Sequence, residues 1–183
     1  MTQMFKTFAQ RLRVFHAARQ GISAIEFAII APVMVLVYFA CIELSLMMVL
    51  DRKVTSSAAA LGDLVARAAT IDDDELDDIL EATRMILEPN PVDDARIRIS
   101  SLYDDDGTVR VAWSDARNMA EWEEDKVVAV PSNLVPENGS VIFAQVEYDY
   151  ESTLGYFITT TKVLSDEFYL RPRRVTHVAR VRD

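Results

Sequence analysis

The sequence predicts an α+β protein in which a long N-terminal transmembrane helix is followed by a second, amphipathic helix and a small antiparallel sheet. Three observations predict this class. Residues 27–50 are apolar with one charged exception, Glu43. Apolar residues then keep helical spacing between 54 and 87, and from residue 95 onward the apolar period changes to two.

The length and charge of the chain limit both its organisation and its partners. The 183 residues allow one compact domain with appendages. The net charge is -10. Residues 1–20 hold no acidic side chain and four basic ones, Lys6, Arg11, Arg13 and Arg19, so the remaining chain carries a charge of -14. Because so acidic a body is repelled by phosphate backbones, we expect no nucleic-acid partner.

The apolar run is long enough to cross a membrane. Residues 27–50 number 24, and a helix needs about 20 mostly apolar residues to span the hydrocarbon core. A cleaved signal peptide is the alternative, with small residues available at 56–63. Such signals have apolar cores of only about 7 to 15 residues, so a span in contact with membrane lipid is favoured. The single cysteine, Cys41, lies in the run and is expected to be a small buried apolar residue, not a disulfide partner.

The flanking charges predict the orientation of this span. The basic leader favours a cytoplasmic N-terminus by the positive-inside rule. We therefore expect three parts in an inner-membrane protein: a cytoplasmic leader at 1–21, the transmembrane helix with its extension at 22–69, and a periplasmic α+β domain at 70–183.

Glu26 stands at the entrance of the span, five residues after Gly21. A carboxylate in hydrocarbon is costly, although the positive end of a helix would favour one at the membrane edge. If the chain were cut after Gly21, Ile22 would carry an α-amine with a pKa of about 7.7 to 8.0. Because i and i+4 share a helical face, Glu26 could pair with this amine in its own chain or in a neighbouring copy.

The run "GISAIEFAIIAPVMVLVYFACIEL" resembles the processing site of type IV prepilins and, more fully, the TadE branch of tight-adherence pseudopilins. The residues that carry the resemblance are Gly21, Glu26, Phe27, Ala28, Ala31, Pro32, Glu43 and Leu44. It covers the first third of the chain well and the remainder only in outline.

The resemblance implies a function and a set of partners. A membrane prepilin peptidase would cut between Gly21 and Ile22, and the mature protein would be a minor pilin-like component that assembles with other pseudopilins or pilin subunits. Glu26, beside the aromatic Phe27, would pair with a terminal amine during assembly. The alternative is an uncleaved single-span anchor that displays a periplasmic binding domain.

Pro32 and Glu43 each allow two interpretations. Pro32 removes the helical hydrogen bond to the carbonyl of Ala28, so it is either a flex point or a tolerated transmembrane proline. Glu43 lies about 25 Å beyond Glu26 along a helix. It could extend into the outer headgroups or contact a second pseudopilin.

The region after the span predicts two helical segments. The span should continue as an extended helix with an apolar stripe at Val54, Ala58, Leu61, Val65 and Ala68. A second helix should begin at a capping box, in which Asp72 is the N-cap and the Glu75 side chain bonds back to it. Ile71 and Leu76 are placed to pack together as a hydrophobic staple, and Pro89 should end the helix. Its buried stripe is predicted to be Leu76, Ile79, Leu80, Thr83 and Ile86 or Leu87. Its acidic first turns suit capping and a solvated face better than calcium.

Alternation then predicts a hairpin and further strands. Six apolar residues are expected on one face: Ile97, Ile99, Tyr103, Val109, Val111 and Trp113. This requires Tyr103 opposite Val109 around a three-residue loop at 105–107, with Gly107 left-handed. Residues 114–126 should form a polar loop, 140–150 a strong strand, and 166–170 and 175–181 weaker strands.

The sequence offers little material for catalysis. His177 is the only histidine outside the leader, and among its arginine neighbours we expect it to be a strand residue. The chain has no glycine-rich phosphate loop, nucleophile motif or cysteine-based metal cluster. We therefore predict a structural protein that is not an enzyme and uses no metal or cofactor.

Overall fold

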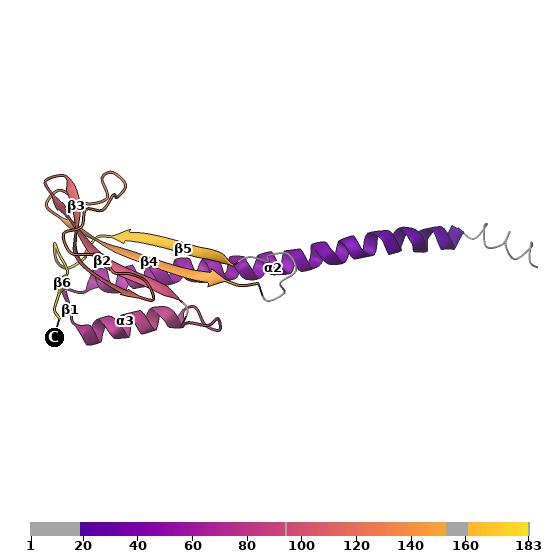
Figure 1. Cartoon of the computed structure of the whole chain (residues 1–183), viewed down its shortest axis with the longest axis horizontal. Coiled ribbons are helices and arrows are strands. Elements are labelled where there is room, and N and C mark those ends of the chain that lie inside the picture. Colours follow the sequence, from indigo (N-terminus) through magenta and orange to yellow (C-terminus); the bar gives the residue numbers. More distant parts are fainter. Residues whose placement is uncertain (1–18, 94, 153–160, 183) are drawn as a thin grey trace, which may run out of the picture. The chain divides into compact units, whose positions relative to one another are not determined.

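A computed structural model of the chain describes residues 19–93, 95–152 and 161–182 (Figure 1). Within these residues the elements follow the order α2, β1, α3, β2, β3, β4, β5, β6. The chain divides into two compact units, Met1–Ser45 and Leu46–Asp183. The predicted α+β class is confirmed, because a long N-terminal apolar helix is followed by a second helix and a small antiparallel sheet.

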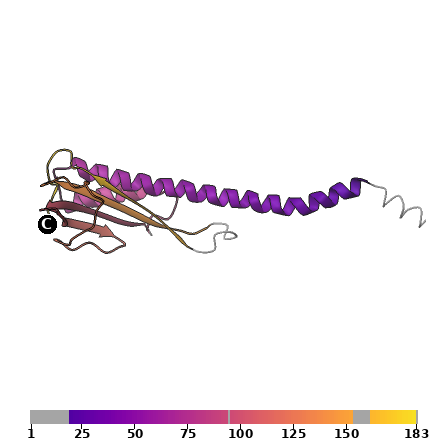
Figure 2. The same cartoon turned by 90° about the horizontal axis from the view of Figure 1, so that it is seen from above.

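Helix α2 spans Arg19–Arg67, which makes 49 residues, and contains Pro32. In the second unit its buried side follows four residues of the predicted stripe, Val54, Ala58, Leu61 and Val65, whereas the fifth, Ala68, lies just after the helix and is only partly buried. Figures 1 and 2 show this C-terminal part of α2 running along one face of the sheet. The stripe forms because residues three and four apart lie on the same side of a helix.

Helix α3 spans Asp73–Met85 and has the predicted cap, Asp72. The Asp72 side chain accepts a hydrogen bond from the backbone N–H of Glu75 at 2.8 Å, which satisfies one of the free donors of the first turn. Leu76, Leu80 and Thr83 are buried in the predicted stripe. The helix ends at Met85, before the predicted stop at Pro89, and hydrogen bonds from residues 86–88 to carbonyls three residues earlier continue the chain as tight turns.

The main sheet has four antiparallel strands in the order β3-β2-β4-β5. The strands are β2 at Arg96–Asp105, β3 at Thr108–Arg117, β4 at Ser140–Tyr150 and β5 at Lys162–Leu170. Strand β4 matches its prediction. Strand β5 is longer than predicted at its start, and β3 takes up residues 114–117, which were expected in the polar loop.

The predicted register of the β2–β3 hairpin is wrong. Tyr103 pairs with Arg110 and Asp104 with Val109, so the turn is the two-residue Asp106-Gly107. Both turn residues have positive φ, 50° and 86°, which a two-residue type I′ turn requires. The left-handed Gly107 is confirmed, but the three-residue loop is not.

A β-bulge explains why the six apolar residues do not share one face. The register shifts between Ser101 and Leu102, so Ser101 pairs with Trp113 while Leu102 pairs with Val111. The extra residue on β3 reverses the alternation there. As a result, Trp113 packs in the core with α2 and α3, whereas Val111 packs on the opposite face.

Two hydrophobic clusters therefore lie on the two faces of the sheet. The larger lies between the inner face and the helices and includes Leu61, Leu80, Ile97 and Ile142. The smaller lies on the outer face and consists of Leu102, Val111, Val141 and Phe143, with partly buried residues of the 122–135 segment packed on them. The sheet is thus covered on both sides.

The C-terminal segment closes one end of the domain. The predicted strand at 175–181 is reduced to β6, Ala179–Arg180, which pairs in parallel with β1, Thr70–Ile71. His177 lies outside it, in a bend. Trp113 Nε1 donates to the carbonyl of Val178 at 2.8 Å, and the Arg180 guanidinium, with a side chain only 6% exposed, bonds Asp115 at 3.0 Å.

Candidate functional site

The predicted cleavage junction lies in the first turns of α2. The peptide bond between Gly21 and Ile22 is helical in the intact chain, and Ile22 is 58% exposed. Glu26 and Phe27 are also exposed. These positions therefore stand on an accessible helix surface within the first unit.

Ile22 and Glu26 lie one helical turn apart. Because both are in α2, they are separated by about 6 Å of helical rise and lie on the same side of the helix. In the intact chain the Ile22 nitrogen is an amide and carries no charge. Glu26 could therefore form an ion pair with the nitrogen of Ile22 only if cleavage made that nitrogen a terminal amine.

The surface that surrounds this junction is apolar. The described residues contain one helix that is long and apolar enough to cross a membrane, with a mean hydropathy of 2.4 in its most apolar window. Only 11% of that window is buried within the chain, whereas the core helix of a soluble protein is mostly buried. The exposed large side chains include Ile25, Ile29, Val33, Leu36, Val37, Tyr38 and Phe39. This helix indicates a single-pass membrane protein.

Three other residues of the apolar run have defined positions. Pro32 lies inside the continuous helix. Cys41 is exposed on its surface, so the expectation that the chain itself buries this thiol is wrong, and in a membrane its neighbours would be lipid. Glu43 is buried, at 1% exposure, unlike the exposed Glu26. The structure does not bring the two glutamates together, because 17 residues of helix separate them.

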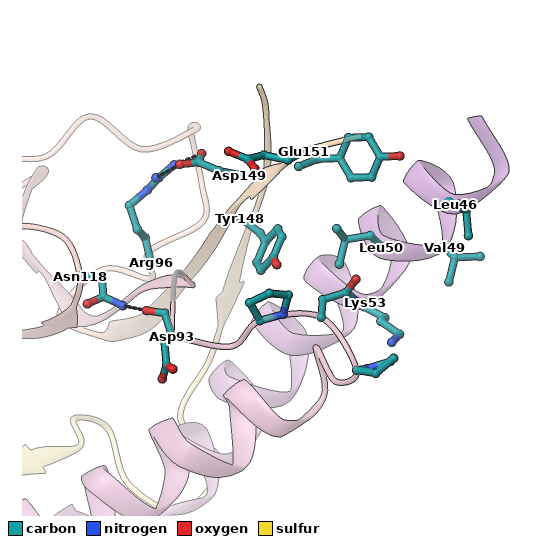
Figure 3. Close-up of a pocket in the computed structure, with 14 residues that line it drawn as sticks. Leu46, Val49, Leu50, Lys53, Asp93, Arg96, Asn118, Tyr148, Asp149 and Glu151 are labelled. Carbon is teal, nitrogen blue, oxygen red and sulfur yellow. Dashed lines mark hydrogen bonds and ion pairs between the residues drawn. The ribbon is translucent and has the colours of Figure 1, made fainter. Parts of the chain in front are cut away.

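The second unit contains a groove of about 830 Å³ that the sequence did not predict. It lies between the start of the second-unit part of α2, the connection from α3 to β2, and the end of β4 (Figure 3). Leu46, Val49 and Leu50 contribute its apolar side, and Tyr148 of β4 points toward Leu50.

An ion-pair network borders this groove. Arg96 of β2 donates to Asp149 at 2.7 Å and to Glu147 at 3.1 Å. The hydrogen bond from Arg96 holds the pKa of Asp149 below its usual range, and the bond to Asp149 in turn raises the pKa of Arg96. Arg96 lies directly opposite Glu147 in the register of β2 and β4. Only the strand order, which the sequence left open, could have revealed this network.

A catalytic centre is not recognisable in the described part of the chain. There, no group of three or more His, Cys, Asp or Glu side chains is placed to hold a metal ion. The acidic turns of α3 face outward, with Asp77 paired to Arg117 at 2.5 Å. The carboxylates of α3 thus serve in capping, in ion pairs or in contact with solvent.

A comparison with known protein families finds a match in the N-terminal segment. Residues 21–62 match the family model described as TadE-like protein. No curated protein and no solved structure matches the chain significantly. The matched segment begins at Gly21, contains the whole apolar run and extends into the buried stripe of α2. The predicted resemblance is therefore confirmed over residues 21–62, where the sequence is similar to TadE-like proteins of tight-adherence pilus systems.

Proposed function

We propose that this protein is a minor pilin-like structural component of a tight-adherence pilus or secretion apparatus, matured by prepilin peptidase between Gly21 and Ile22. The observation that carries the proposal is the start of the TadE-like match at Gly21, the residue before the predicted cut. Immediately after Gly21 the chain forms an exposed apolar helix, which is joined to a folded domain. Both features suit a subunit that leaves its leader behind and joins others through its helix.

The proposed orientation places the leader, residues 1–21, in the cytoplasm and the α+β domain, residues 70–183, in the periplasm. Its support is the charge distribution, with four cations and no acid before Gly21 and a strongly acidic remainder. The inner membrane is then the site of processing. The partners are the peptidase, other pseudopilins or pilin subunits, and membrane lipid.

Glu26 is proposed to act as the counter-charge of the new amine at Ile22. The two residues share a helix face, and both lie on the exposed surface where a neighbouring helix would pack. An ion pair at the membrane edge is strengthened by its low-dielectric surroundings. Pairing with a neighbour would therefore set the axial position of one subunit against the next.

The N-terminus of the mature chain tests this proposal. Mass spectrometry of protein extracted from membranes of cells with an active prepilin peptidase should find Ile22 as the first residue. A catalytically inactive peptidase in the same strain should leave the leader attached. Full-length chains in both strains would instead support the uncleaved anchor, in which α2 only tethers a periplasmic binding domain.

A further inference from the structure

The groove of the second unit lies where the apolar run of α2 ends. Leu46 and Val49 line it and are exposed by 48% and 56%, while Leu50, which also lines it, is buried. Lys53 is three residues further, or about 4.5 Å along the helix, and lines the same groove. The lining of the groove thus changes from apolar to charged between Leu50 and Lys53. This is the part of α2 where a membrane-spanning helix would leave the hydrocarbon core.

The charges of the groove are mixed. Two cations, Lys53 and Arg96, line it together with three carboxylates, Asp93, Asp149 and Glu151. Arg96 and Asp149 neutralise one another, and Asp93 is paired with Arg84 at 2.5 Å. One cation and one carboxylate remain, Lys53 on the α2 side and Glu151 on the β4 side (Figure 3).

Neither of these two forms an ion pair within 4.0 Å in the part of the chain that the structure describes. The Lys53 ammonium donates only to the main-chain carbonyl of Glu88, and no basic group in these residues lies within 4.0 Å of the Glu151 carboxylate. An ammonium has three donors, so Lys53 retains the capacity to bind a phosphate oxygen. Glu151 can accept hydrogen bonds from an amine in the same way.

We propose that this groove binds a phospholipid of the surrounding membrane whose headgroup carries both a phosphate and a primary amine. The phosphate would contact Lys53, the amine would contact Glu151, and an acyl chain would follow Leu46 and Val49 toward the hydrocarbon core. The inference rests on the membrane placement of α2 in the proposed function, and it is independent of cleavage and pilus assembly.

Charge complementarity selects this headgroup over two others. An anionic headgroup without an amine would bring a negative charge to a groove in which carboxylates already outnumber cations. A choline headgroup has the cation but no N–H, so it could not donate to Glu151. A zwitterionic headgroup with a primary amine satisfies both unpaired side chains.

Native mass spectrometry of the full chain in mild detergent tests the proposal. Purified protein would be stripped of lipid and titrated with phosphatidylethanolamine, phosphatidylcholine and phosphatidylglycerol of identical acyl chains. We expect phosphatidylethanolamine to bind most tightly. Lys53→Gln should weaken it by about fivefold, as expected for one basic residue at a membrane surface, while Lys53→Arg should retain binding. Glu151→Gln should remove the preference for the primary amine over choline.

Matched variants outside the groove provide the controls. Arg52→Gln removes the neighbouring exposed cation and Glu137→Gln removes an exposed carboxylate, and both should bind lipid as the wild type does. Equal affinity for the three lipids would overturn the proposal. Equal losses of phosphatidylethanolamine affinity in Lys53→Gln and Arg52→Gln would also overturn it. Extraction of the chain without detergent would refute the membrane placement itself, whereas a missing preference in a detergent-requiring protein would refute only the lipid site.

Discussion

Gly62 of α2 faces Ala144 of β4 where helix and sheet approach closely. A Cβ atom added at Gly62 would lie 3.3 Å from the Cβ of Ala144 and 2.5 Å from Cδ1 of Leu170. The Leu170 atom belongs to the end of a flexible side chain, but Ala144 is fully buried in the core and has little room to move. Glycine therefore allows α2 to pack against the inner face of the sheet at this distance.

Gly62→Val should destabilise the second unit. Valine gains helix propensity over glycine by a few tenths of a kcal/mol, but overpacking of a dense core costs about 1 to 3 kcal/mol. Chemical unfolding of the full chain in detergent should show the net loss, and Ser56→Val, on the exposed side of α2, should change the free energy of unfolding far less. Comparable effects of the two variants would show that the close approach is unimportant.

The cap of α3 gives a second stability prediction. Asp72→Ala leaves the N–H of Glu75 without its side-chain acceptor and should lower the free energy of unfolding by about 1 kcal/mol. Asp72→Ser should restore most of the loss, because serine also caps. Asp74→Ala, in the same turn but not at the cap, is the control and should have a smaller effect.

The ion pair of Arg96 and Asp149 should make stability depend on pH. The pKa of Asp149 is lower in the folded state than its ordinary value of about 3.9, because Arg96 donates to its carboxylate. The stabilisation is therefore complete above that ordinary value and is lost as pH falls through the lower folded-state pKa. Wild type should exceed Asp149→Asn in stability near neutral pH, and the difference should shrink below about pH 4.

Removal of the donor checks the origin of this pH dependence. In an Arg96→Gln background, Asp149→Asn should have a much smaller effect at neutral pH, since the charge-assisted bonds are already absent. Additive losses in the double variant would mean that Asp149 acts through another group.

Gly21→Leu should block processing and leave membrane insertion intact. A side chain at the scissile residue would clash in a peptidase pocket that accepts glycine, while the apolar run from residue 27 is unchanged. Immunoblotting of the membrane fraction would detect the uncleaved chain by its larger size. Cleavage of this variant at the normal rate would contradict the assignment of the junction.

Glu26→Gln should separate assembly from processing. The amide keeps the size of the side chain but removes its charge, so pairing with an Ile22 amine is lost while cleavage and folding of the second unit persist. Recovery of pseudopilin partners in a pull-down should fall sharply, alongside a normal processing blot. Undiminished recovery together with normal pilus assembly would exclude this role for Glu26.

Helical features were predictable because their signals are local. The stripe from Val54 to Val65 and the Asp72 cap depend on residues three or four apart, which helix geometry brings together regardless of the remaining fold. The end of α3 was less predictable, since the turns after Met85 lie between the helix and the proline that was expected to stop it.

Sheet features failed where distant residues decide the outcome. The bulge on β3 opposite Ser101 brings Val111 to the outer face beside Leu102, and that face becomes a core only because the 122–135 segment covers it. The apolar–polar alternation of β2 and β3 carries no information about this covering segment. The groove was likewise hidden, because Lys53, Arg96 and Glu151 meet only through tertiary packing.

The pairing of β6 with β1 joins segments that are far apart in the sequence. Arg173, Ala179 and Val181 donate backbone hydrogen bonds to the carbonyls of Ala66, Ala69 and Ile71, so residues about a hundred positions apart hold this end of the domain together. Because a long loop of chain must close before such distant residues meet, contacts of this kind are slow to form. We therefore expect the pairing of β1 with β6 to be a late event in the folding of the domain.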